Sequence, residues 1–225
     1  MIARKDPQRA RKLTLAKKLG IAFIIVGVCV GMVPIFTIAY GRYQQNKLLE
    51  RTEAKIKAER EKASREKDRD TKLMKTTPVG HTGPWPAVKI IIPKLGIEQV
   101  VQEGIDADTL TQSPGHYPKT VNPGQVGWCA IAGHRITFSA PFDRLNEMAR
   151  GDRIILETAE ARFVYLFNTI ITVPDTANLD MSDTDKARII LTTCEPKTGS
   201  SHRLIARGTL APYPASRYLI PPKKQ

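Results

Sequence analysis

The chain is poor in cysteine, aromatic and acidic residues. Only three of its 225 residues are cysteine and 6% are aromatic, which excludes a small domain held together by many disulfide bonds. Glycine and proline, at 15 and 16 residues, are too few for a collagen-like chain, and a hydrophobic share of 41% excludes a wholly disordered one. The length allows one mid-sized domain with appendages.

The shortage of acidic residues is confined to the first third of the chain. Residues 1–77 hold 19 basic and 8 acidic residues, whereas residues 78–225 hold 16 and 14. The remaining excess in the second part equals Lys223 and Lys224, next to the C-terminus. Because the main domain is nearly neutral, it lacks the basic face with which proteins bind nucleic acid, and we expect no nucleic-acid partner.

Charged residues are absent from one long apolar run near the N-terminus. The run Leu19–Tyr40 has 22 residues and no charged side chain. As a helix it would be roughly 33 Å long, enough to cross a hydrocarbon core of about 30 Å. A cleaved signal peptide is the alternative, but its apolar region usually has only about 7–15 residues. We therefore predict a transmembrane helix over residues 19–40.

Basic residues gather in front of this run. Residues 1–18 hold seven basic residues and one acidic residue, Asp6. Positive charge stays on the cytoplasmic side of a membrane span. We therefore expect residues 1–18 to form a cytoplasmic tail and the chain after Tyr40 to lie outside. The expected localisation is the cell membrane, with a single pass and an extracellular main domain.

A charged segment follows the apolar run. Residues 42–77 contain neither Gly nor Pro and hold 12 basic and 7 acidic residues, with pairs such as Glu53 and Lys57 at helical spacing. This pattern predicts an exposed helical stalk over residues 41–77. A disordered charged linker is the alternative, since each such pair contributes only about 0.2–0.5 kcal/mol. Either would separate the following domain from the bilayer.

Short β-branched runs separated by turn-rich stretches dominate residues 78–225. The long helical patterns that alternate with strands in a parallel α/β sheet are absent. Seven or eight strands in about 145 residues therefore predict an all-β domain with a closed or nearly closed barrel, and Phe142–Ala149 could add one short helix. The expected strands are Val88–Ile92, Ile97–Val101, Val126–Gly133, Arg153–Glu157, Arg162–Val173, Ala187–Cys194 and Arg203–Leu210.

The three cysteines have different surroundings. Cys29 lies in the apolar run, where a thiol is an inert apolar side chain. Cys129 lies in an expected strand, and the two-residue alternation places it with Ile131 on the face opposite to His134. A disulfide between Cys129 and Cys194, or a buried core thiol at either position, remains an alternative.

Cys194 is the candidate nucleophile. It ends an apolar strand in which two threonines precede the thiol. A strand end that opens to solvent suits a reactive thiol, since only an accessible, ionisable sulfur attacks a carbonyl. Glu195 follows directly, and a carboxylate at that position disfavours the ionised form of a nearby sulfur.

A cysteine nucleophile needs an acid or base for the leaving amine and a donor for the charge on the attacked carbonyl. Of the four histidines only His134 also ends an apolar strand, with a structural or surface role as the alternative. Arg203 begins the last expected strand nine residues after Cys194, so a loop could bring it back to the thiol, unless it is a solvated surface charge. No cluster of His, Cys, Asp and Glu has metal-ligand spacing, and we expect no metal or other cofactor.

The order and spacing of these residues resemble the signature of the sortases, cysteine transpeptidases of Gram-positive cell envelopes. The resemblance covers about residues 84–212. The His-Tyr-Pro turn and the single N-terminal anchor are most similar to class E sortases of actinobacteria, with class D as the neighbouring option. The segments that carry the resemblance are Ile90–Ile97, Gly115–Pro118, Ala130–Arg135, Ala140–Leu145, Gly151–Asp152 and Leu191–Cys194.

The resemblance implies an eight-stranded sortase barrel with its functional groups at one end of a substrate groove. It implies that Cys194 is the nucleophile, His134 the general acid/base and Arg203 the donor to the substrate carbonyl or oxyanion. Thr193 and Tyr117 are implied to line the groove, although a structural role for Tyr117 is an equal alternative.

The resemblance also implies the reaction and the partners. The substrate would be an exported protein with an LPXTG-like or LAXTG-like C-terminal sorting signal, cleaved between Thr and Gly through a thioacyl intermediate. An amine of a peptidoglycan precursor or of another protein, such as a pilin, would resolve that intermediate. The alternatives are a pilin-polymerising sortase, a simple cysteine endopeptidase and, least favoured, a non-catalytic tethered surface module.

Overall fold

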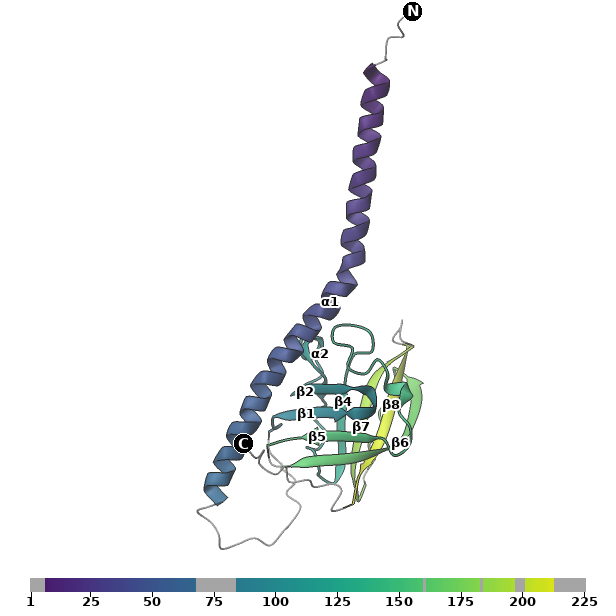
Figure 1. Cartoon of the computed structure of the whole chain (residues 1–225). Coiled ribbons are helices and arrows are strands. Elements are labelled where there is room, and N and C mark those ends of the chain that lie inside the picture. Colours follow the sequence, from purple (N-terminus) through teal and green to yellow (C-terminus); the bar gives the residue numbers. More distant parts are fainter. Residues whose placement is uncertain (1–6, 68–83, 160, 183, 197–200, 213–225) are drawn as a thin grey trace, which may run out of the picture.

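A long helix runs beside a β-barrel in this protein (Figure 1). The computed structural model describes residues 7–67, 84–159, 161–182, 184–196 and 201–212. Most of the expected membrane anchor and stalk therefore lies within the described residues. The first six residues of the expected cytoplasmic tail and the last part of the expected stalk, residues 68–77, lie outside them.

Helix α1 (Pro7–Lys67) joins the expected anchor and the expected stalk into one element. Within the described part of the chain, it is the one helix long and apolar enough to cross a membrane. Its large apolar side chains, among them Phe23 and Phe36, are exposed, and this half of the helix extends away from the barrel (Figure 1). Exposed apolar surface of this extent is typical of a segment covered by lipid or by a partner, in agreement with the predicted span.

Eight strands close into one barrel, in the order β1-β2-β3-β4-β7-β8-β6-β5. This confirms the expected all-β fold. The strands are β1 (Val88–Ile92), β2 (Ile97–Glu103), β3 (Gly115–His116), β4 (Gly127–Ala132), β5 (Arg153–Glu157), β6 (Arg162–Pro174), β7 (Ala187–Glu195) and β8 (His202–Leu210). The short helices are η1 (Pro93–Leu95), α2 (Ala107–Gln112) and η2 (Leu145–Glu147).

Three short elements differ from the sequence-based expectation. Strand β3 occupies what was expected to be a turn, because two residues are too few to show an alternating pattern. Helix α2 was not expected, although Asp106 caps it by accepting a hydrogen bond from the Thr109 amide at 2.9 Å. The helix expected over Phe142–Ala149 is reduced to the single 3-10 turn η2.

Alternation along β4 assigns its side chains to two different clusters. Cys129 and Ile131 are fully buried inside the barrel, whereas Trp128 and Ala130 pack in a separate cluster with Ile190. The predicted separation of the two faces is confirmed. All three cysteines are free, so the alternative of a disulfide between the cysteines of the domain is wrong. Burial raises the pKa of the Cys129 thiol, which makes this cysteine inert.

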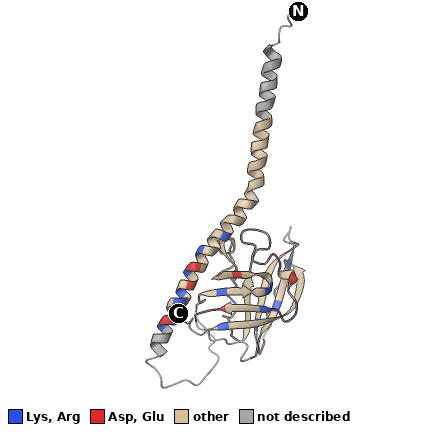
Figure 2. Cartoon of the chain, in the orientation of Figure 1, with Lys and Arg blue, Asp and Glu red and all other residues tan. Residues whose placement is uncertain are grey.

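The C-terminal half of α1 packs along the barrel, and this differs from the expectation of an exposed stalk. Ile56 is 4% exposed. Lys89 of β1 donates to Glu53 of the helix at 3.1 Å and to Glu98 of β2 at 2.7 Å. Figure 2 shows acidic (red) and basic (blue) residues along the ribbon of this half of the helix, which runs next to the barrel. The sequence shows which residues of this segment are charged, but not which of them face the barrel.

His116 anchors the beginning of the domain to the barrel. Its ring is buried and stacks on Trp85 at a centroid distance of 3.8 Å. Its Nδ1 lies 2.9 Å from a Glu103 carboxylate oxygen, and its Nε2 lies 2.8 Å from the Thr120 hydroxyl. Burial lowers the pKa of His116 although Glu103 acts in the opposite direction. The ring is therefore neutral in the folded protein at pH 7.

We expect the stability of the domain to fall as the pH drops below about 6.5, the ordinary value for histidine. As the pH falls, His116 is protonated in the unfolded chain before it is protonated in the folded one, because its folded pKa is lower. The stability that the neutral ring contributes is therefore complete above about pH 6.5 and is lost as the pH falls from there to the folded pKa. Urea unfolding between pH 7.5 and 5 should show this slope, at most about 1.4 kcal/mol per pH unit per histidine. His116→Gln should reduce the slope, and a slope equal to that of the unsubstituted protein would contradict the prediction.

Candidate active site

Cys194 and Arg203 face each other across the two strands that end the domain. They are direct partners in the antiparallel register of β7 and β8. The Arg203 Nη1 donates to the Cys194 sulfur at 3.1 Å. The predicted return of the arginine to the thiol is therefore what the structure shows. A guanidinium at this distance can also donate to an oxygen on the carbon that the sulfur attacks.

His134 reaches the same place through the pairing of β4 with β7. These two strands are parallel, with Ala132 opposite Thr192. The next residue continues the pairing, since the Gly133 amide donates to the Thr192 carbonyl at 3.0 Å. His134 and Cys194 each lie two residues beyond this matched pair. Continued past Ala132, the last residue of β4, the two-residue alternation predicts that both lie on the same face and at the same end of the barrel.

That shared face is the outer one. On β7, Ile189 and Leu191 point into the main core, the cluster inside the barrel that contains Cys129. Ile190 belongs to the outer cluster, which it forms with Trp128 and Ala130 on the other face of the sheet. Cys194 therefore continues the outer row. On β8, Leu204 is in the main core and Ile205 in the outer cluster, so Arg203 is in the outer row as well. The structure thus brings Cys194 and Arg203 together at one end of the outer face, and from the alternation we infer the same face for His134, two residues beyond the end of β4.

The His134 side chain is half-buried. Burial lowers its pKa below the ordinary value of 6.5, so the imidazole is mainly neutral at pH 7 and able to accept a proton. Its ring lies 5.2 Å from the Phe138 ring, centroid to centroid. Its carbonyl accepts a hydrogen bond from the Phe142 amide at 3.1 Å, which ties the residue to the loop that follows it.

Arg135 is a buried part of the site that the sequence analysis missed. Its guanidinium, 4% exposed, donates to the Cys194 carbonyl at 3.1 Å and to the Asn146 amide oxygen at 3.1 Å. It also forms an ion pair with Glu195. The carboxylate expected to disfavour the ionised sulfur is therefore compensated by a neighbouring positive charge. The signal was present in the sequence, since Arg135 directly follows the candidate histidine.

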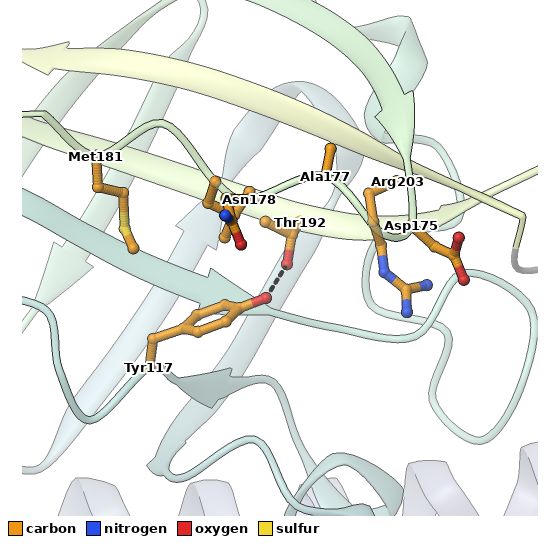
Figure 3. Close-up of a pocket in the computed structure, with 8 residues that line it drawn as sticks. Tyr117, Asp175, Ala177, Asn178, Met181, Thr192 and Arg203 are labelled. Carbon is orange, nitrogen blue, oxygen red and sulfur yellow. Dashed lines mark hydrogen bonds between the residues drawn. The ribbon is translucent and has the colours of Figure 1, made fainter.

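An open pocket of about 460 Å³ lies beside Arg203. Figure 3 shows Tyr117 reaching from one wall toward Thr192, and their hydroxyls are 3.1 Å apart. The opposite wall comes from the chain between β6 and β7. The lining residues are Tyr117, Asp175, Ala177, Asn178, Leu179, Met181, Thr192 and Arg203. Tyr117 therefore lines this pocket, and its expected role in substrate binding stays a prediction.

Thr193 lies elsewhere. It is 3% exposed and belongs to the inward-facing row of β7, whereas Thr192 takes the place on the pocket wall. The reason is the two-residue alternation of a strand: if Cys194 faces outward, its neighbour faces inward. A groove-lining role by the Thr193 side chain does not fit this orientation.

Comparisons with known proteins agree with this geometry. The family described as "Sortase domain" matches residues 90–211. Sortase SrtE1 of Streptomyces coelicolor is 33% identical over 135 residues, which are 53% of this chain and 38% of that protein. Sortase D of Bacillus subtilis is 35% identical over 106 residues, 47% of this chain and 52% of that protein. The chain thus spans at most about half the length of these relatives.

A solved structure shows the same likeness. The structure of sortase E from Streptomyces avermitilis superposes with a TM-score of 0.51 at 30% identity and covers 59% of this chain and 91% of that one. The match includes relatives named for class E and for class D, the two classes indicated by the sequence. The family match runs from β1 through β8 and covers more than half of the chain. The chain therefore belongs to the sortase family.

Proposed function

We propose that this protein is a membrane-anchored cysteine transpeptidase that cleaves a C-terminal sorting signal and transfers the cleaved protein to an amine. The observation that carries the proposal is the contact between the Arg203 guanidinium and the Cys194 sulfur beside an open pocket. Support for the role of His134 comes from its position two residues beyond Ala132, the last residue of the neighbouring parallel strand β4, which pairs with Thr192. A nucleophile, a proton carrier and a donor for developing charge are the groups that acyl transfer requires.

Bond cleavage begins at the sulfur. The Cys194 sulfur attacks the threonine carbonyl of the signal, while neutral His134 takes up the thiol proton. Arg203 donates to the carbonyl oxygen as it becomes negative, in a site partly removed from water. The Thr–Gly bond then breaks, and His134 returns the proton to the leaving glycine amine. The product is a thioester between Cys194 and the threonine carbonyl.

The second half of the reaction resolves the thioester. An amine attacks its carbonyl carbon, His134 accepts the amine proton, and the C–S bond breaks. The proton returns to the sulfur, which restores the free enzyme. The proposed acceptor is the amine of a peptidoglycan precursor; a pilin amine is the alternative acceptor. If water takes the place of the amine, the same groups act as an endopeptidase.

The pocket suits an extended peptide with an apolar residue. Leu179 and Met181 supply apolar surface on one wall, and the hydroxyls of Tyr117 and Thr192 supply polar contacts on the other. An LPXTG-like or LAXTG-like signal offers an apolar leucine and a polar threonine for such surfaces. With residues 1–18 in the cytoplasm, the barrel would lie outside the cell, where exported proteins carry such a signal.

Cys194→Ala should abolish turnover and the covalent intermediate. We expect intact-mass spectrometry of the unsubstituted protein, incubated with LPXTG and LAXTG peptides, to show an acyl adduct on Cys194 and a ligated product when an amine is added. Cys29→Ala is the matched control, because that thiol lies in the apolar half of α1, and it should keep the adduct. Hydrolysis without ligation at high amine concentration would favour the endopeptidase, and turnover by Cys194→Ala would refute the mechanism.

Arg203→Lys should lower kcat by about 10²–10³-fold with little change in KM. The reason is that the lysine ammonium group cannot reproduce the geometry in which the arginine guanidinium donates to the oxyanion of the transition state. The measurement is steady-state peptide cleavage. Arg207→Lys is the matched control, since Arg207 lies four residues further along the outer row of β8, over Trp128. A loss of similar size in both variants would show that the effect is one of strand packing.

A further inference from the structure

The membrane-proximal part of α1 touches the loop that carries His134. Gly41 is buried and directly follows the predicted membrane span. A Cβ atom at Gly41 would lie 2.6 Å from the Ser139 amide nitrogen and 2.7 Å from the Phe138 carbonyl carbon. Both are backbone atoms, which cannot turn aside as a side-chain end can. The helix and the loop are therefore in backbone contact, and only glycine fits at this position.

The contacted loop is held in a conformation that it would not adopt alone. Phe138 and Ala140 have positive φ values of 56° and 43°, and such non-glycine residues cost about 1 kcal/mol or more each. Strain of this kind persists only where surrounding contacts enforce it. The loop also reaches back to the histidine, since the Phe138 ring lies 5.2 Å from the His134 ring.

A second contact fixes the helix one turn later. The Gln45 side chain is 3% exposed. Its amide nitrogen donates to the Gln112 carbonyl at 2.7 Å, and its oxygen accepts from the Val100 amide at 3.3 Å. Because a buried amide with two backbone partners has little freedom to move, this residue sets the rotation of α1 against the barrel.

Contacts continue toward the end of the helix. Arg60 donates to the Ala159 carbonyl at 3.1 Å and to the Thr158 carbonyl at 2.9 Å. Together with the Lys89–Glu53 ion pair, they hold α1 along the barrel over about five turns. Figure 1 shows that, before this docked stretch begins, the apolar half of the helix extends away from the barrel.

We propose that Gly41 is a positioning residue for His134, and that the docked part of α1 is a support of the active site as well as a tether. The helix presses on Phe138 and Ser139, and the loop in turn holds the imidazole over the paired ends of β4 and β7. One consequence is that the reacting groups are held at a fixed height above the membrane surface. This inference rests on the proposed role of His134 as the acid/base.

The test is a glycine series in the full-length protein in lipid nanodiscs, with peptide cleavage as the activity. Gly41→Ala should lower kcat by about 10–100-fold with KM changed less than about twofold, since misplacing a catalytic group by about 1 Å costs rates of this order; Gly41→Leu should lose more. Gly31→Ala is the matched control, because it makes the same substitution in α1 at a position where a Cβ has no atom within 4 Å. Equal kcat in the two alanine variants would overturn the proposal.

A second variant keeps the proposal testable if added bulk at Gly41 prevents folding. Gln45→Ala loosens the helix without adding atoms and should lower kcat about 3–10-fold at unchanged KM, whereas the neighbouring Gln44→Ala should not. Unchanged kcat in Gln45→Ala would count against the proposal.

An NMR measurement separates this inference from the proposed function. The His134 imidazole resonances should shift in Gly41→Ala and not in Gly31→Ala, whether or not peptide is cleaved. Unshifted His134 resonances in folded Gly41→Ala would overturn the positioning role. Absence of turnover in the unsubstituted protein would instead refute the proposed function alone.

Discussion

The parallel pairing of β4 with β7 is the constraint on which the site depends. It sets Ala132 opposite Thr192, and parallel strands end at the same edge. Cys194 lies two residues further along β7, on its outer face, and the same alternation continued past the end of β4 predicts His134 beside it. The antiparallel return of β8 then adds Arg203 opposite the cysteine. A one-residue slip in either pairing would turn one of these groups to the other side of the sheet.

Charge compensation is the second requirement at this edge. Three charged side chains lie within two residues of the candidate nucleophile or in contact with it, namely Arg135, Glu195 and Arg203. The ion pair between Arg135 and Glu195 is largely shielded from water. In such surroundings a charge without a partner would destabilise the folded protein by several kcal/mol. It leaves Arg203 directed at the sulfur. The buried arginine thus serves both the packing of the strand ends and the electrostatics of the site.

The helix that carries the predicted membrane span also packs against the barrel through its C-terminal half. A free tether would need neither the buried amide of Gln45 nor the buried glycine at the loop, and both lie on the face of α1 that meets the domain. The loop next to His134 is conformationally strained, and such strain persists only where neighbouring contacts hold it. The contact with α1 supplies one such restraint. The docked half of α1, the loop and the proposed acid/base therefore form one continuous set of contacts.

Sequence alone determined the barrel strands, the apolar span, the facing of Cys129 and the three candidate groups, because alternation and apolar runs are local patterns. It did not reveal β3, whose two residues carry no pattern, nor Arg135, whose role exists only once Cys194 and Glu195 lie beside it. The sequence led us to expect Thr193 on the wall of the groove, whereas its side chain is buried. It also led us to expect a stalk exposed to solvent, whereas the C-terminal half of α1 packs against the barrel. Those points required the tertiary structure, since strand register and helix docking are decided by contacts between residues far apart in the chain.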